Sequence, residues 1–139
     1  TLVIVTADHE TGGLGLGNGQ YKIKPLIIKR VKGSSDFISR KFDPDFSNIQ
    51  QIMIKYAGIQ DLTDKEKALI KNMNKTKYAG GLGVSKLISS RAMIGWTTEA
   101  HSGCDVPVMA QGPGSQYFKG FIDNTDLPKL IANALGIEF

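Results

Sequence analysis

The pattern of hydrophobic positions predicts a chain of mixed strands and helices. Residues 2–5 form an apolar run rich in β-branched side chains and without polar alternation. Such a run is typical of a strand covered on both faces of a parallel sheet. Residues 21–24 also favour a strand, because lysines alternate there with other residues as they do in a half-exposed edge strand, and the apolar residues 25–28 resemble a strand as well. Residues 105–110 indicate a further strand.

Helical spacing appears in the middle of the chain. Apolar residues three and four positions apart predict a helix from Asp43 and Pro44 that ends at Gly58. Its apolar face consists of Phe46, Ile49, Ile52, Met53 and Tyr56. A second helix is expected from Thr63 towards Asn72, since Thr63 and Glu66 have the spacing of a capping box. Neither helix carries a histidine, so we assign them a packing role.

Two more helices are predicted towards the end. Residues 84–94 favour a helix that contains Arg91, followed by Trp96 as a core or wall residue. We interpret Arg91 as solvated or paired with a carboxylate, as helical arginines usually are. The last helix begins at the cap cluster of residues 123–126, carries Pro128 in its first turn and ends before Gly136. It is expected to cover the sheet.

Glycine-rich segments bracket the middle of the chain. The loop at residues 12–19 lacks the third glycine of a dinucleotide-binding fingerprint, so we interpret it as a hairpin or mobile loop with Asn18 and Gly19 in its turn. Residues 80–83 are a second glycine-rich turn or hinge. Together they outline an expected insertion at about residues 14–83.

Candidate chemistry follows the first strand. Asp8 and His9 lie where the chain leaves that strand, and the carboxyl ends of parallel strands are where ligands bind. Carboxylate and imidazole groups suit a metal, although a strand-end Asp also serves as a simple cap. The chain has one other histidine, His101. Taken alone, each residue leaves the metal and the structural interpretation open.

Three ordered segments decide between these interpretations. TADHETGG near residue 10, HSGCDVPVMAQGPGSQYF from His101 and FIDNTDLPKLIANAL near the end occur in this order. The chain at this point resembles the alkaline phosphatases, over roughly residues 1–13 and 92–135. The resemblance implies a three-layer α/β/α sandwich, incomplete in this chain. It also implies metal-dependent hydrolysis of phosphate monoesters through a phosphoserine intermediate.

The resemblance also implies the site. Asp8 and His9 would hold the Zn²⁺ that contacts the nucleophilic serine, and His101 would hold a second Zn²⁺. The serine and the residues of a Mg²⁺ site belong to segments upstream, so no catalytic nucleophile is assigned here. We therefore expect residues 1–139 to be a C-terminal portion that is inactive alone and is completed by an upstream half. Glu10 and Thr11 remain undecided between supporting hydrogen bonds and loop formation.

Composition and charge bound the remaining alternatives. The net charge of +4 suggests nucleic-acid binding as one possible function. The basic stretch at residues 22–32 lacks interleaved aromatic residues, so we set this function aside. The sequence contains no apolar stretch long enough for a transmembrane segment. The single Cys104 allows no internal disulfide. The resemblance implies a periplasmic or extracellular location, and it suggests that the protein forms a homodimer. Alternatives are a stand-alone metal-binding or interaction module, or a phosphodiesterase or sulfatase of the same superfamily.

Overall fold

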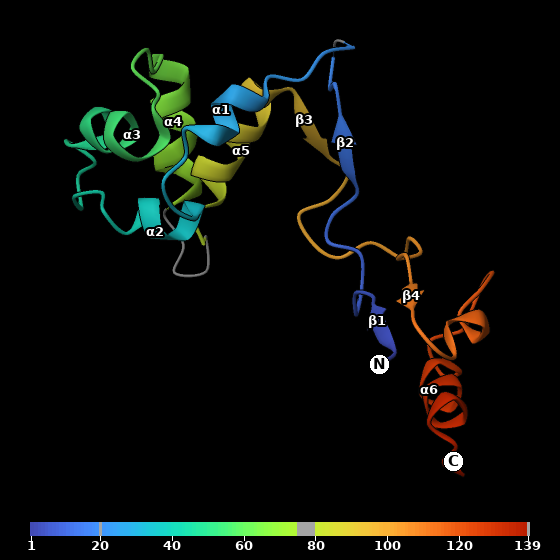
Figure 1. The fold of residues 1–139 in the computed structure, drawn as a ribbon. Helices are drawn as coiled ribbons and strands as arrows, with labels where there is room; N and C mark the ends of the chain where they lie inside the picture. Colours follow the sequence, from blue (N-terminus) through green and yellow to red (C-terminus); the bar gives the residue numbers. More distant parts are fainter. Residues whose placement is uncertain (20, 75–79, 139) are drawn as a thin grey trace. The chain divides into compact units, whose positions relative to one another are not determined.

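The structure is a computed structural model that describes residues 1–19, 21–74 and 80–138. The chain divides into two compact units, Thr1–Gly13 with Thr98–Phe139, and Leu14–Thr97. Each unit contains one two-stranded antiparallel sheet (Figure 1). The interpretation of residues 14–83 as an insertion stays a prediction. No helix in the described ranges is both long enough and apolar enough to cross a membrane.

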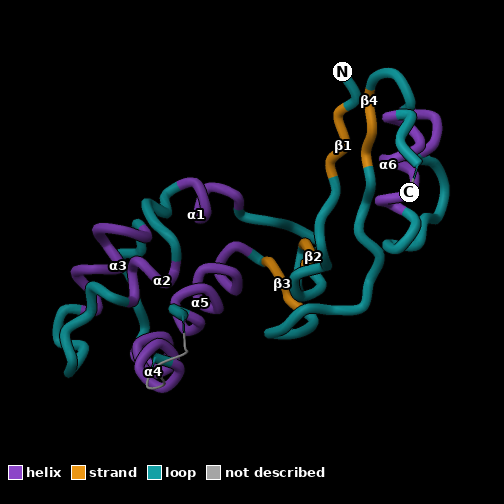
Figure 2. Tube along the Cα trace, turned by 90° about the horizontal axis from the view of Figure 1, so that it is seen from below, coloured by secondary structure: helices purple, strands orange, loops and turns teal. Residues whose placement is uncertain are grey.

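The first unit is built on the strand pair β1 (Val3–Val5) and β4 (Met109–Gln111). The strands run antiparallel and side by side, with Ile4 opposite Ala110 (Figure 2). The expected strand is confirmed; its partner in this chain is antiparallel rather than parallel, and burial on both faces stays a prediction. Val3 and Val5 are 53% and 52% exposed, because the described residues place no second layer over them. A β-branched run specifies an extended backbone without specifying the direction of its partner.

The first unit ends in a short 3₁₀ helix, η1 (Ser115–Tyr117), and the helix α6 (Leu127–Leu135), which packs against it. The predicted final helix is confirmed, with Pro128 in its first turn and Gly136 at its end at φ 68°. Asp126 precedes the helix, but its side chain does not cap a backbone N–H of α6. Its carboxylate instead accepts a hydrogen bond from Lys129 Nζ at 2.8 Å. Whether α6 covers a larger sheet stays a prediction.

The second unit is mainly helical and has its own core. Its elements are β2 (Leu14–Leu16), α1 (Pro25–Lys29), α2 (Ser35–Ser39), α3 (Ile49–Ala57), α4 (Asp64–Met73), α5 (Leu82–Ala92) and β3 (Ile94–Trp96). Helix α5 packs against α1, α2 and α4 (Figure 1). The largest fully buried side chains are Ile38, Met53, Ile70, Leu87 and Val84. Ile38, Met53 and Ile70 come from α2, α3 and α4, and Val84 and Leu87 come from α5, so four helices contribute to this core.

The strands expected at residues 21–28 were wrong. Residues 25–29 form α1, with Pro25 at its start, and residues 21–24 are irregular. Proline at the first helical position has a fixed φ suited to a helix and loses no intrahelical bond. The alternation of lysine and apolar residues was too short to separate a strand from one helical turn and a loop, so the edge-strand interpretation of the basic stretch fails.

The predicted helices α3 and α4 are confirmed with one shifted boundary. Helix α3 begins after Asn48 rather than at Asp43, because Phe46 adopts a left-handed backbone at φ 61°. Gly58 ends it at φ 67°, as expected. The capping box of α4 is formed: Thr63 N donates to Glu66 Oε2 at 2.8 Å, and Glu66 N donates to the Thr63 hydroxyl at 3.3 Å.

The glycine-rich segments behave differently from one another. Asn18 and Gly19 form the expected turn, but β2 pairs with the distant β3 instead of closing a local hairpin. Helix α5 starts two residues earlier than predicted, behind Gly81 at φ 77°, and Ile94 belongs to β3. Trp96 is 50% exposed on β3 rather than in the core, and its Nε1 donates to the Ser89 hydroxyl.

Candidate functional site

The candidate site lies in the first unit, where two loops that are far apart in sequence meet. One loop follows β1, and the other leads towards β4. Glu10 and Ser102 form an isolated antiparallel bridge between them, and Thr98 N donates to the Gly12 carbonyl at 3.2 Å. The two motifs that carry the predicted metal ligands are therefore adjacent in space.

The three predicted ligands come together at this junction. The imidazole rings of His9 and His101 stack with centroids 3.4 Å apart and an angle of 22° between their planes. Asp8 Oδ2 lies 3.3 Å from His9 Nε2, and His9 N donates to Asp8 Oδ1 at 3.1 Å. The Asp8 side chain is 86% exposed and that of His9 is 34% exposed. The group thus opens to solvent.

An oxygen acceptor lies beside each ring nitrogen of His9. Its Nδ1 lies 3.0 Å from the Glu10 carbonyl oxygen. A carbonyl only accepts hydrogen bonds, so Nδ1 is the donor in this contact, while Asp8 Oδ2 lies 3.3 Å from Nε2. In the neutral form of this ring, Nε2 is then the nitrogen whose lone pair is available to a metal.

The types of donor atom fit zinc, which takes imidazole nitrogen and carboxylate oxygen. Their number is smaller than a complete pair of sites requires, since one zinc usually has three or four protein ligands. Within residues 1–19, 21–74 and 80–138, no group of three or more His, Cys, Asp or Glu side chains is placed so that it could hold a metal ion. Zinc binding by these residues stays a prediction.

Glu10, which the sequence left undecided between supporting hydrogen bonds and loop formation, joins the two loops. Its carboxylate accepts hydrogen bonds from the Ser102 hydroxyl, from Gly12 N at 2.8 Å and from Gly13 N at 2.7 Å. These donors, the Ser102 hydroxyl foremost, lower the pKa of Glu10 to about 2, so the group is ionised at neutral pH. Gly12 and Gly13 have φ of 118° and 64°, which lets the backbone fold back onto the carboxylate.

Ser102 was missed as a contributor to the site. Its hydroxyl donates to Glu10, which lies 92 positions away in the sequence. No local sequence pattern predicts such a contact. The one available signal was its position directly after His101 in the matched motif. The Cys104 thiol is free and exposed, and the backbone N of Cys104 donates to the Ser102 hydroxyl at 3.5 Å.

Arg91 takes no part in this group and is paired as predicted. Its guanidinium donates to Glu66 Oε1 at 2.6 Å and to Asp61 Oδ1 at 2.6 Å. The pairing with Arg91 lowers the pKa of Glu66 to about 2. The network ties the end of α5 to the start of α4 and is structural.

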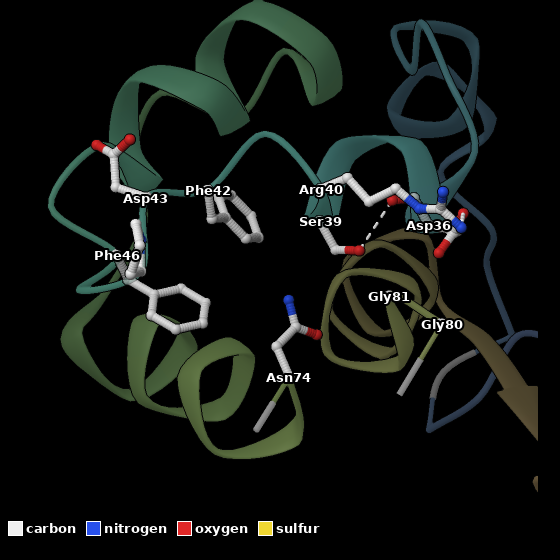
Figure 3. A pocket seen from close by; sticks show the side chains of 10 residues that line it. Asp36, Ser39, Arg40, Phe42, Asp43, Phe46, Asn74, Gly80 and Gly81 are labelled. Atoms are coloured by element: carbon white, nitrogen blue, oxygen red, sulfur yellow. Dashed lines mark hydrogen bonds and ion pairs between the residues drawn. The ribbon is translucent and has the colours of Figure 1, made fainter. Parts of the chain in front are cut away.

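The second unit contains a separate cavity of about 430 Å³. Figure 3 shows Phe42 and Phe46 on one side of it and Asp36 with Arg40 on the other. Arg40 and Asp36 are paired with each other at 2.9 Å. The cavity lining contains no histidine, so it is not part of the candidate site.

Comparison with known proteins decides the family. The family model described as alkaline phosphatase matches residues 1–137. The chain belongs to the alkaline phosphatase family. The match includes Asp8, His9 and His101, and it confirms the resemblance inferred from the ordered motifs. It also covers residues 14–90, which resembled nothing in the sequence analysis.

Curated alkaline phosphatases are similar to nearly the whole chain. "Alkaline phosphatase 3" of Bacillus subtilis is 36% identical and covers 97% of the chain. "Alkaline phosphatase 4" of the same organism is 33% identical with the same coverage. The "Repressible alkaline phosphatase" of Saccharomyces cerevisiae is 32% identical over 99% of the chain. The chain spans only 29–30% of the length of these relatives.

A solved structure agrees with these matches. The crystal structure of the cold-active alkaline phosphatase from the psychrophile Shewanella sp. has a TM-score of 0.76 and 33% sequence identity. The similarity covers 96% of this chain and 34% of that one. The expected fold class is therefore confirmed: the chain has an incomplete α/β fold of the alkaline phosphatase type.

Proposed function

We propose that the native polypeptide that carries this sequence hydrolyses phosphate monoesters, releasing an alcohol and inorganic phosphate. One observation carries the proposal: the loop with Asp8 and His9 and the loop with His101 meet side by side inside a region that matches the alkaline phosphatase family throughout. Phosphoryl transfer passes through a phosphoserine whose serine lies outside this chain. The second half of the reaction hydrolyses that intermediate.

The metal ligands of the proposal are the residues that the structure brings together. Asp8 and His9 hold one Zn²⁺ and His101 holds a second, each with further ligands from outside the chain, as does a Mg²⁺ site. When bound, such a pair of cations stabilises the charge on the entering and leaving oxygens of an in-line displacement.

The chain's own residues prepare this binding. The bond from His9 Nδ1 to the Glu10 carbonyl leaves Nε2 unprotonated in the neutral ring, and Asp8 Oδ2 beside it supplies negative charge. Ionised Glu10 holds the turn after these ligands through Gly12 N and Gly13 N. A ligand loop fixed in this way loses little entropy when it binds a cation.

Parts beyond this chain complete the enzyme in the proposal. The chain covers about 30% of its curated relatives, and Val3, Val5 and Met109 leave apolar surface exposed on the strand pair. We propose that an upstream half of the same protein covers these strands and supplies the serine and remaining ligands. The isolated 139 residues are then inactive. A homodimer and a periplasmic or cell-surface location complete the proposal.

The test is a substrate comparison on the native polypeptide. It should hydrolyse p-nitrophenyl phosphate much faster than bis(p-nitrophenyl) phosphate or p-nitrophenyl sulfate, and His101→Ala should lose this activity while the exposed Lys119→Ala keeps it. Preference for the diester or the sulfate ester would favour the other superfamily chemistries. A wild-type protein with no esterase activity on any of the three would favour the stand-alone module.

A further inference from the structure

We propose that Glu10 and Ser102 are positioning residues, a side-chain clip that holds the His9 loop and the His101 loop in register for metal binding. The inference rests on the proposed function and deepens it. Neither residue is a metal ligand in this proposal. Each acts through the histidine that precedes it directly in the sequence.

The clip consists of one side-chain bond and one backbone bridge. The Ser102 hydroxyl donates to Glu10 Oε2, and the two residues are also paired across the antiparallel bridge. Because His9 precedes Glu10 and His101 precedes Ser102, the clip fixes the two backbone positions next to the imidazole rings. The rings stack 3.4 Å apart directly beside it.

The donors around Glu10 explain why the position calls for a carboxylate. Oε2 accepts from Ser102 and from Gly12 N at 2.8 Å, while Gly13 N donates to Oε1 at 2.7 Å. Both oxygens therefore face hydrogen-bond donors. An amide at this position would turn an NH₂ group towards one of those donors, and two donors cannot bond to each other.

The same geometry separates Glu10 from Asp8. Asp8 Oδ2 faces the metal-competent nitrogen of His9 and is exposed to solvent. Glu10 is engaged by the turn at Gly12 and Gly13 and by the second loop. Residues that orient metal ligands in this way typically change metal affinity or activity by roughly 10- to 100-fold when they are replaced.

The decisive variant is Ser102→Ala, because it removes the hydroxyl that bonds to Glu10 and accepts from Cys104 N at 3.5 Å, and it leaves the backbone donors of Glu10 in place. Ser102→Thr keeps the hydroxyl and is the conservative rescue. Ser90→Ala, an exposed serine in the second unit, is the matched control. All are made in the native polypeptide, and zinc affinity is measured by competition with a chromophoric chelator, alongside kcat and KM for p-nitrophenyl phosphate.

The proposal predicts that Ser102→Ala weakens zinc binding roughly 10- to 100-fold. At limiting zinc its kcat falls with little change in KM, because fewer molecules carry a complete site. Ser102→Thr and Ser90→Ala should bind zinc like the wild type. Glu10→Gln should also weaken binding, and the double variant should be no worse than Glu10→Gln alone, since residues of one unit are non-additive.

Two results would overturn the clip. One is wild-type zinc affinity in Ser102→Ala and Glu10→Gln; the other is an additive loss in the double variant. If Ser102→Ala fails to fold, Glu10→Gln decides the question, because glutamine has nearly the same size and shape as glutamate. A wild-type protein that neither binds zinc nor hydrolyses the ester would instead refute the proposed function, so the two failures are distinguishable.

Discussion

Replacing Arg91 by methionine should destabilise the chain far more than replacing any exposed arginine. Arg91 Nε and Nη2 donate to the two oxygens of Glu66 at 2.6 and 2.7 Å, and Nη1 donates to Asp61 Oδ1 at 2.6 Å. Methionine keeps most of the aliphatic stem and removes all of these bonds. The Glu66 carboxylate then keeps the bonds that the structure describes from Thr63, through its backbone N and its hydroxyl.

The magnitude follows from exposure. The Arg91 and Glu66 side chains are 22% and 20% exposed, so their two-fold contact lies between a surface pair, worth about 0–1 kcal/mol, and a buried pair, whose disruption costs about 3–5 kcal/mol. Asp61 is 82% exposed, and its share is screened by solvent. We expect Arg91→Met to lower the free energy of unfolding by about 2–3 kcal/mol.

Urea denaturation followed by circular dichroism measures this loss. With a slope of about 2 kcal/mol per molar urea, the midpoint should fall by about 1–1.5 M. The matched control is Arg40→Met. Arg40 is 76% exposed and pairs with Asp36 one helical turn away, a contact worth only about 0.2–0.5 kcal/mol.

The pH dependence gives an independent check. Arg91 holds the pKa of Glu66 at about 2, well below its ordinary value of 4.5. A depressed carboxyl pKa contributes stability above the unfolded value and loses it as the pH falls towards the folded value. The difference in the free energy of unfolding between wild type and Arg91→Met should therefore have its full size at pH 6 and should shrink as the pH falls from 4.5 to about 2. Equal midpoints for the Arg91 and Arg40 variants, or a difference independent of pH, would refute this reasoning.

Four further predictions concern the core, a helix cap, a backbone turn and the metal. Met53→Ala empties a fully buried position and should cost about 2–5 kcal/mol in urea denaturation; a loss within error would show that the second unit lacks this core. Thr63→Ala breaks the capping box with Glu66 and should cost about 1 kcal/mol, with loss of amide protection confined to the start of α4. Gly81→Ala should cost more than about 1 kcal/mol in thermal unfolding, because Gly81 has φ 77° and a Cβ there would lie 2.2 Å from the Ser35 carbonyl; an unchanged midpoint would contradict this turn. Removal of divalent ions from the native polypeptide by a chelator should abolish phosphomonoesterase activity, and Zn²⁺ should restore it.

Local signals in the sequence predicted the elements whose causes are local. The capping box of α4 joins residues three apart, and Gly58 ends α3 through its own backbone conformation. Both were therefore visible in the sequence. The start of α3 was predicted wrongly because Phe46 takes a left-handed backbone conformation. A phenylalanine side chain gives no indication of that conformation in the sequence. Residues 25–28 were missed because one short turn carries too little periodicity to identify a helix.

Long-range features could be predicted only where a motif carried them. The resemblance named Asp8, His9 and His101, and the structure brings them together. The antiparallel partner of β1 and the bond from Ser102 to Glu10 depend on segments about a hundred residues away. Strand direction and such contacts are set by tertiary packing, so no pattern within either segment specifies them.

Titration of Zn²⁺ into the metal-free native polypeptide, with hydrolysis of p-nitrophenyl phosphate as the signal, tests the central claim most directly. The account predicts that activity is absent without metal, rises with added Zn²⁺ to saturation in the wild type, and stays absent in His101→Ala. Activity that is independent of Zn²⁺, or that is the same in His101→Ala, would contradict the assignment of this site.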